Sequence, residues 1–364
     1  MGVTLAKSGI DRIRPHMLVA ESSDPKPPWA LLHSNESVFG PSPLAREAAR
    51  ASVSDIERYL EFPDHILAPA IGECFNLDAN RIITGQGSDD LLARLARAYL
   101  GPGDQLIRSA NGYLKVPNYA HANDAEPVSV ADDNLVPSVD NMIAALTERT
   151  KIVYLANPEN PAGTYLNGAE IRRLHAALPD HVLLVLDNAY EEYVDASDYE
   201  PGHLLVEEAN NVIMCRTFSK IYGLAGARVG WAFGPEDVID VLRRIGLTFP
   251  VASPSAAAVI AAMQDPEHIR YVFEQNRAGR NFLADQVIQL GLNVVPSQAN
   301  FMLIHMPDSE FSAAKAEAFL LNRGILIRRL NAPAYKDYIR VTIGMRHQLE
   351  AVVAGLRDFL AGGE

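Results

Sequence analysis

Short apolar runs alternate with amphipathic helical stretches over residues 40–245, and this alternation restricts the possible folds more than any other feature of the chain. The runs are rich in β-branched residues and are bounded by turn residues, which is typical of strands. Strands covered by helices on both faces show as continuous apolar sequence, and LLVLD at 183–187 is such a run. The pattern predicts an α/β fold in which a mostly parallel sheet is the middle of three αβα layers. The predicted strands lie in DQLIRSA, EPVSVA, KIVYLAN, HVLLVLDNAY, NVIMCRTFS and RVGWAFG.

Three segments are predicted along the 364 residues, a length that is enough for one large domain or two modest ones. Residues 1–39 are expected to form an N-terminal arm and part of a small domain, and the proline-rich residues 1–30 are expected to wrap over a neighbouring surface. Residues 40–250 are expected to form the large domain, and residues 251–364 a smaller α+β domain. Residues 252–291 are expected to be one long helical stretch.

Composition excludes several classes of protein. A net charge of −13 argues against nucleic-acid binding, which favours basic surfaces. No uncharged apolar run reaches the roughly 18 residues of a membrane span, and the charged N-terminus lacks the apolar core of a secretory signal. Cys74 and Cys215 are too few for a disulfide framework, have no metal-ligand spacing and are expected to be buried. We therefore expect a cytoplasmic protein without a metal site.

The segment TFSKIYGLAGARVGW, residues 217–231, combines a reactive amine with donors for an anion. Lys220 can form a Schiff base with a carbonyl cofactor, and Arg228 can clamp a phosphate through charge-assisted hydrogen bonds. The hydroxyls of Thr217 and Ser219 add donors, and the glycines of the segment allow close backbone approach. The alternative is an ordinary pair of solvated surface charges.

Two further segments place polar side chains at strand ends. Asp187 ends the buried run LLVLD, and ligands bind at the carboxyl ends of parallel strands. A carboxylate there could pair with a protonated pyridine nitrogen and keep the ring electron-withdrawing, although it could equally cap the following helix. Tyr190 and Asn160, the latter in the turn NPENPAGT, could donate to the phenolic oxygen of the same ring.

The run TGQGSDD follows a predicted strand and opens a predicted helix. Gly87, Ser88 and Asp89 would supply backbone N–H groups and a hydroxyl at the helix N-terminus, which is a suitable site for an anion. The glycine spacing fits neither a P-loop nor a dinucleotide fingerprint. Nucleotide binding, and with it a dehydrogenase, is therefore not expected.

The ordered motifs resemble those of the fold-type I pyridoxal-phosphate aminotransferases of class I and II, and most closely the histidinol-phosphate aminotransferase branch. The resemblance extends from about residue 32 to the C-terminal helix. It implies pyridoxal 5'-phosphate as cofactor, the large and small domains of that fold, and a homodimer with shared active sites. It also implies transfer of an amino group from a donor such as glutamate to an oxo acid or oxo phosphate. The motifs are NESVFGPSP, RYLEFP, GQGSDD, NPENPAGT, LDNAYEEY, TFSKIYGLAGARVGW, ANF and RVTIG.

The resemblance implies a role for each matching cofactor residue. Lys220 matches the lysine that holds the cofactor as an imine and moves the substrate proton, and Asp187 matches the partner of the pyridine nitrogen. Asn160 and Tyr190 match the pair that bonds the phenolic oxygen, and Tyr113 matches the aromatic residue that stacks on the ring. The residues that match the phosphate site are Gly87, Ser88, Asp89, Thr217, Ser219 and Arg228.

The resemblance also implies residues for the substrate and for a second subunit. Tyr59 matches a tyrosine that reaches the cofactor phosphate of the neighbouring subunit. Arg340 in YIRVTIG matches the arginine that clamps the substrate carboxylate, or the phosphate of histidinol phosphate. Arg328, on the preceding predicted strand, and Asn35 are expected to assist it.

Several positions depart from the family pattern, and they leave the substrate pair open. An enzyme for histidinol phosphate needs cations for a second phosphate, for which Lys115 is a candidate; the alternative is a solvated loop charge. Another pyridoxal-phosphate reaction, such as decarboxylation of an amino acid phosphate, cyclisation or elimination, also stays open, because the scaffold does not fix the reaction. The departures are LEFPD after Tyr59, Asn111–Gly112, Glu159, Ala162, Asn188 and TFPVASPS.

Overall fold

The computed structural model describes residues 6–13, 28–306, 310–330 and 332–362. At its centre lies a seven-stranded sheet with the order β2-β8-β7-β6-β5-β3-β4. Only β8 runs antiparallel to its neighbours, so the predicted mostly parallel sheet is confirmed. The strands are β2 (Ile82–Gly85), β3 (Gln105–Ser109), β4 (Glu126–Val130), β5 (Thr150–Ala156), β6 (Leu183–Asp187), β7 (Val212–Thr217) and β8 (Gly230–Phe233).

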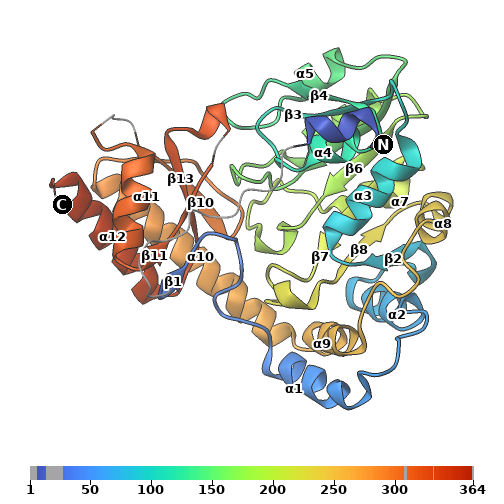
Figure 1. Ribbon diagram of the computed structural model, residues 1–364, viewed down its shortest axis with the longest axis horizontal. Helices are drawn as coiled ribbons and strands as arrows, with labels where there is room; N and C mark the ends of the chain where they lie inside the picture. The colour runs from blue at the N-terminus through green and yellow to red at the C-terminus, as the bar shows by residue number, and fades with distance from the viewer. Residues whose placement is uncertain (1–5, 14–27, 307–309, 331, 363–364) are drawn as a thin grey trace, which may run out of the picture.

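Helices cover both faces of this sheet, as Figure 1 shows. Alternate residues of a strand point to opposite faces, and in β6 Leu184 and Leu186 join one apolar core while Leu183 and Val185 join another. The two cores establish the three αβα layers. The helices of this part are α1 (Pro43–Ser52), α2 (Asp64–Phe75), α3 (Ser88–Tyr99), α4 (Val116–His121), α5 (Val139–Ala144), α6 (Gly168–Ala176), α7 (Gly202–Glu208), α8 (Glu236–Arg244) and α9 (Ser253–Met263).

The helical stretch predicted over residues 252–291 is interrupted. It consists of α9 and a separate helix α10 (Pro266–Gln289), with Asp265 between them. The Asp265 side chain accepts a hydrogen bond from the backbone N–H of His268, and Pro266 has no N–H to continue the preceding helix. The prediction of a single helical stretch was therefore wrong at this cap.

The C-terminal part has its own sheet and its own core. Four strands pair antiparallel in the order β12-β13-β10-β9, and α10 runs from α9 into this part (Figure 1). The short strand β1 (Ala30–Leu31) pairs parallel with β11 (Ile325–Leu326), which ties the early chain to the C-terminal part. The remaining elements are β9 (Asn293–Val294), β10 (Phe301–His305), β12 (Arg328–Arg329), β13 (Tyr338–Thr342), α11 (Ala313–Asn322) and α12 (Arg346–Leu360).

The described piece of the N-terminal arm lies against α4 of its own chain. The backbone N–H of Gly9 donates to Asp124 at 2.7 Å, and Arg12 pairs with Glu126 at 3.0 Å. The proline-rich stretch 14–27 lies outside the described residues, so the predicted wrapping over a neighbouring surface stays a prediction.

Two further findings concern the exclusions made from sequence. Cys215 is buried as expected, but Cys74 is exposed, because it lies on the outer side of α2 and not among the α2 residues that face the core. Among the described residues, no helix is long and apolar enough to cross a membrane.

Candidate active site

A cavity of about 380 Å³ lies where β5, β6 and β7 end and α3 begins. Parallel strands present their carboxyl ends at one edge of a sheet, so residues far apart in sequence meet there. The predicted site residues that line the cavity are Ser88, Asp89, Tyr113, Asn160, Asp187, Tyr190, Thr217, Ser219, Lys220 and Arg228. The structure thus brings together most of the residues that the sequence motifs singled out.

One end of the cavity is built to approach an anion closely. The Arg228 guanidinium donates to Ser219 Oγ at 3.3 Å, and Thr217 Oγ1 donates to the same oxygen at 3.0 Å. Gly87 has a φ of 79°, and a Cβ there would lie 2.5 Å from Arg228 Nη2. Only glycine fits this left-handed position without displacing the guanidinium. The cradle of backbone N–H, hydroxyl and guanidinium groups fits a phosphate.

Asp187 also lines the cavity and is 7 % exposed, and it forms no ion pair with a cation among the described residues. Tyr154 donates its hydroxyl to Asp187 Oδ2 at 2.8 Å. Burial raises the pKa of Asp187 to about 6, although the hydrogen bond from Tyr154 opposes the rise. A buried carboxyl group with a raised pKa fits a ligand that brings a protonated ring nitrogen, and the nearby charge of Lys220 does not cancel the rise.

Lys220 lines the same cavity. Its Nζ donates to the backbone oxygen of Asn35 at 3.4 Å and lies 5.4 Å from the centre of the Tyr190 ring. Asn35 is held in place, since its side chain donates to Tyr190 Oη at 3.1 Å and Asn300 donates to its backbone oxygen at 3.0 Å. The amine is therefore positioned by a carbonyl and not neutralised by a carboxylate.

Arg340 lies just behind the cavity wall. It is 8 % exposed and donates to Asn160 Oδ1 at 2.9 Å and to the backbone oxygen of His33 at 3.0 Å. Burial lowers the pKa of Arg340 to about 10, and Arg328 faces it across the β12–β13 ladder. Its buried Nε has no partner among the described residues. Two cations on adjacent strands are suited to an anionic substrate group.

Two predicted residues lie elsewhere. Tyr59 is 74 % exposed and stacks on Phe249 with ring centres 4.1 Å apart, outside the cavity of its own chain. Lys115, the candidate for a substrate phosphate, donates to Asp89 Oδ2 at 2.8 Å. This contact ties it to Asp89, which lines the cavity with Ser88 and Arg228, and its predicted role toward a substrate phosphate stays a prediction.

Sequence reasoning missed several residues that hold the site together. Tyr154, the hydroxyl partner of Asp187, is one of them. Because strand residues alternate between faces, a tyrosine two residues before the end of KIVYLA shares a face with the cavity residue Ala156. That pattern could have identified it. Asn300 lies in the motif ANF but received no role, because only the fold brings it to Asn35.

Glu159 is a buried acid directly behind the cavity wall. It is 2 % exposed, and its Oε1 accepts a hydrogen bond from the backbone N–H of Asn160 at 3.0 Å. A Cβ on Gly112 would lie 2.8 Å from Oε2, so the side chain is tightly enclosed. Burial raises the pKa of Glu159 to about 8, although the charge of Arg108 opposes the rise. The group is therefore protonated in the folded protein near neutral pH.

Replacing Glu159 by glutamine is expected to remove a pH dependence of stability. Because the folded pKa lies above the unfolded one, folding loses free energy as the pH rises from about 4.5 to about 8. Across that interval the free energy of unfolding of the variant should rise by roughly 3–5 kcal/mol relative to that of the wild type, given about 1.4 kcal/mol per pKa unit. Urea unfolding of both proteins at pH 5 and pH 8 measures this gain. An equal difference at the two pH values would contradict the assignment.

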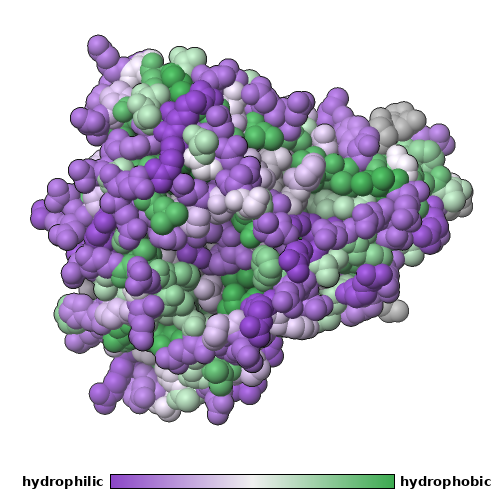
Figure 2. Space-filling view, turned by 180° about the vertical axis from the view of Figure 1, so that it is seen from behind, coloured by the Kyte–Doolittle hydropathy of each residue, from purple (hydrophilic) through white to green (hydrophobic). Residues whose placement is uncertain are grey.

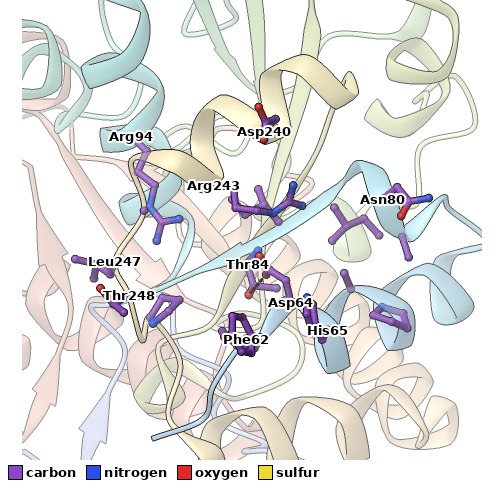
Figure 3. A pocket seen from close by; sticks show the side chains of 18 of the residues that line it. Phe62, Asp64, His65, Asn80, Thr84, Arg94, Asp240, Arg243, Leu247 and Thr248 are labelled. Atoms are coloured by element: carbon purple, nitrogen blue, oxygen red, sulfur yellow. Dashed lines mark hydrogen bonds between the residues drawn. The ribbon is translucent and has the colours of Figure 1, made fainter.

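A larger cavity of about 1380 Å³ lies between α2, β2 and α8 (Figure 3). Figure 3 shows the hydrogen bond from Thr84 to Asp64 in this cavity, which is also lined by Arg94 of α3 and by Arg243 and Asp240 of α8. Its lining contains no lysine and none of the predicted catalytic residues. We therefore place the active site in the smaller cavity, where the amine, the buried acid and the anion cradle meet.

Residues 27–356 match the family Aminotransferase class I and II. The chain is 43% identical over 355 residues to the histidinol-phosphate aminotransferase of Paramagnetospirillum magneticum, with 97% of this chain and 98% of that protein covered. It is 44% identical to the histidinol-phosphate aminotransferase of Nitrobacter hamburgensis, with 91% of each covered.

Solved structures give the same picture. The histidinol-phosphate aminotransferase of Sinorhizobium meliloti, crystallised with pyridoxal-5'-phosphate, superposes with a TM-score of 0.87 and 28% identity, covering 92% of this chain and 91% of that one. An aspartate aminotransferase of Thermus thermophilus shares the fold at a TM-score of 0.79 and 22% identity, with 91% of this chain and 96% of that one covered.

Proposed function

The chain belongs to the class I and II aminotransferase family, and we propose that it binds pyridoxal 5'-phosphate at Lys220 and moves an amino group between histidinol phosphate and an oxo acid. One observation carries the proposal: a single cavity contains the Lys220 amine and the buried Asp187, and Asn160 links its wall to the buried Arg340. Lys220 and Asp187 suit a carbonyl cofactor with a basic ring nitrogen, and Arg340 suits an anionic substrate.

The cofactor, when bound, supplies a protonated ring that withdraws electrons from the substrate carbon. Asp187 would hold the proton on the ring nitrogen, and Tyr154 would orient that carboxylate. The phosphate would lie on Gly87, Ser88 and Arg228, where the missing Cβ of Gly87 leaves room for close approach. Fixing both ends of the ring defines its orientation toward Lys220.

Lys220 and Tyr190 divide the proton chemistry. Lys220 Nζ would take the proton from the substrate carbon and deliver it to the cofactor carbon, because its amine lines the cavity and forms no ion pair among the described residues. Tyr190 Oη already accepts a hydrogen bond from Asn35, so its own proton is directed elsewhere and can be donated to the phenolic oxygen. Asn160 would donate to the same oxygen through its amide nitrogen, since its Oδ1 accepts from Arg340.

Arg340 would bind the anionic end of both substrates. In one half-reaction it would hold a carboxylate of the oxo acid, and in the other the phosphate of histidinol phosphate, the compound named for the relatives at 43% and 44% identity. Arg328 across the ladder adds the second positive charge that a phosphate dianion favours. Replacing Arg340 by alanine should raise KM for both substrates, which steady-state kinetics measures.

The direct test is the absorption spectrum of the purified holoenzyme during titration with histidinol phosphate and, separately, with glutamate. Each should convert the bound cofactor to pyridoxamine phosphate, identified by chromatography after acid release. Conversion by glutamate but not by histidinol phosphate would support the aminotransferase activity and would rule out histidinol phosphate as the substrate. Release of carbon dioxide, or loss of amino acid without pyridoxamine phosphate, would favour another reaction on this scaffold.

We also infer a cytoplasmic homodimer with shared sites. Large apolar side chains of the larger cavity are exposed: Phe62 is 64 % exposed, Leu247 55 % and Phe249 40 %. Figure 2 shows apolar side chains on the lower left, the side on which α1, α2 and α9 lie. A second copy on this surface would bury them, and Tyr59 would reach the phosphate of the partner's cofactor.

Replacing Leu247 by aspartate is expected to shift the protein toward monomers, because it places a charge in the apolar surface that the partner would cover. Light scattering coupled to gel filtration measures the mass of both forms. The matched control is Ile288→Asp, since Ile288 is 57 % exposed but lies on α10 in the C-terminal part. A monomeric wild type, or equal effects of the two substitutions, would argue against this interface.

A further inference from the structure

The carboxylate of Asp89 receives three donors from one neighbouring segment. Its Oδ1 accepts from the hydroxyl of Tyr113 at 3.0 Å and from that of Tyr119 at 2.7 Å. Its Oδ2 accepts from Lys115 Nζ at 2.8 Å. Asp89 is in the first turn of α3, whereas the donors come from the turn before α4 and from α4 itself. One carboxylate therefore fixes the segment that carries Tyr113 to the helix that opens the phosphate end.

The same carboxylate creates an electrostatic difficulty for a phosphate. Asp89 lines the cavity together with Ser88, Ser219 and Arg228, the residues of the anion cradle. Among the charged lining residues, the acids Glu36, Asp89 and Asp187 outnumber the cations Lys220 and Arg228. A cavity with excess acid disfavours a dianion unless a further cation lies close by.

Lys115 supplies that cation. Burial acts to raise the pKa of Asp89, but the hydrogen bonds from Lys115, Tyr119 and Tyr113 outweigh it, so the pKa lies below its ordinary value. Asp89 therefore stays ionised, and its charge is balanced by the ammonium group in direct contact. The two tyrosines contribute hydrogen bonds but no charge, which separates the two roles within one cluster.

We propose that Lys115 is a positioning residue of the cofactor site that neutralises Asp89, so that this carboxylate can anchor Tyr113 without repelling the cofactor phosphate. The inference rests on the proposed function, since it assumes that pyridoxal 5'-phosphate occupies this cavity. It assigns Lys115 to the cofactor and not to the substrate. Tyr119 shares the anchoring of Asp89 but has no part in the charge balance.

The test compares two ligands that differ only in the phosphate. The full-length chain, stripped of cofactor, is titrated with pyridoxal 5'-phosphate and with pyridoxal, and Kd is measured by absorption. Lys115→Met should lower the affinity for pyridoxal 5'-phosphate about tenfold. An exposed pair of charges changes an equilibrium constant by up to about fivefold, and the phosphate carries nearly two charges. Affinity for pyridoxal should stay within about twofold, the size of a negligible effect on the free energy scale.

Three controls separate charge from structure. Lys115→Arg keeps the charge and should keep the affinity. Tyr119→Phe removes a donor without removing a charge, so the ratio of the two Kd values should be unchanged. Asp89→Asn combined with Lys115→Met removes both charges and should restore the wild-type ratio. The loss in Lys115→Met should also shrink as salt is raised, because the pair is solvent-accessible.

Each other result has a defined meaning. Three results would overturn the proposal. Lys115→Met could lower the affinity for pyridoxal 5'-phosphate and for pyridoxal by the same factor, or it could leave both Kd values unchanged. Tyr119→Phe could change the ratio of the two Kd values as much as Lys115→Met does. An unchanged Kd with a raised KM for histidinol phosphate would return Lys115 to the substrate. If the wild-type chain bound neither ligand, the proposed function itself would fail, which is a different outcome from a failure of Lys115 alone.

Discussion

Lys220→Ala is expected to abolish turnover while the chain still folds and still binds pyridoxal 5'-phosphate. Lys220 contributes one weak hydrogen bond to the backbone of Asn35 at 3.4 Å and no ion pair among the described residues, so its loss costs little stability. The cradle around Arg228 stays intact and continues to hold the phosphate. What is lost is both the covalent link to the cofactor and the group that moves the substrate proton, and proton transfer by a positioned side chain alone contributes about 10²–10⁴-fold.

Borohydride reduction followed by peptide mass spectrometry measures the covalent link directly. The wild type should carry the reduced cofactor on the peptide that contains Lys220, and the variant should carry none. Lys220→Arg is the matched control, because it keeps a positive charge of similar length but cannot form the link or donate a proton easily. An alanine variant that turns over at near wild-type rate, or a cofactor found on another lysine, would refute the assignment.

Asp187→Asn is expected to lower kcat by roughly 10²–10³-fold, the effect seen when one preorganised electrostatic group is removed. An amide cannot hold a proton on the ring nitrogen, so the ring would withdraw electrons less strongly. The substitution is nearly isosteric, and Tyr154 can still donate to the amide oxygen, so the cavity should keep its shape. Cofactor affinity should fall much less than kcat, because the phosphate end is untouched.

The cofactor-free protein gives a second measurement of the same assignment. Because burial raises the pKa of Asp187 to about 6, the folded cofactor-free wild type loses stability as the pH rises from about 4 to about 6, and the asparagine variant should not. Above pH 7 the cofactor-free variant should therefore be the more stable by about 3 kcal/mol, at about 1.4 kcal/mol per pKa unit. The cofactor should stabilise the wild type more than the variant. Stabilities that run in parallel across this pH range would show that Asp187 is not a buried acid with a raised pKa.

The fold of the large sheet could be predicted from the sequence because local patterns and tertiary packing agree there. Alternate apolar residues of LLVLD join separate cores on the two faces of β6, which agrees with the strand covered on both sides that the continuous apolar run predicts. The apolar pattern did not locate the break at Asp265, which a local signal marks instead: the Asp265 side chain accepts a hydrogen bond from the backbone N–H of His268, and Pro266 has no N–H to continue α9. The apolar pattern also could not show that Cys74 faces outward on α2.

The candidate residues of the site could be predicted from the sequence: Lys220, Asp187, Asn160, Tyr190 and Arg228 stand in recognisable motifs, and strand ends in a parallel sheet bring them to one cavity. Their electrostatics was decided only by the tertiary structure. Whether Glu159 is neutral and whether Lys115 serves Asp89 or a substrate depend on burial and on distances between segments that are remote in the chain. Charge states follow from solvation and from neighbours in space, and no local pattern in a sequence contains either.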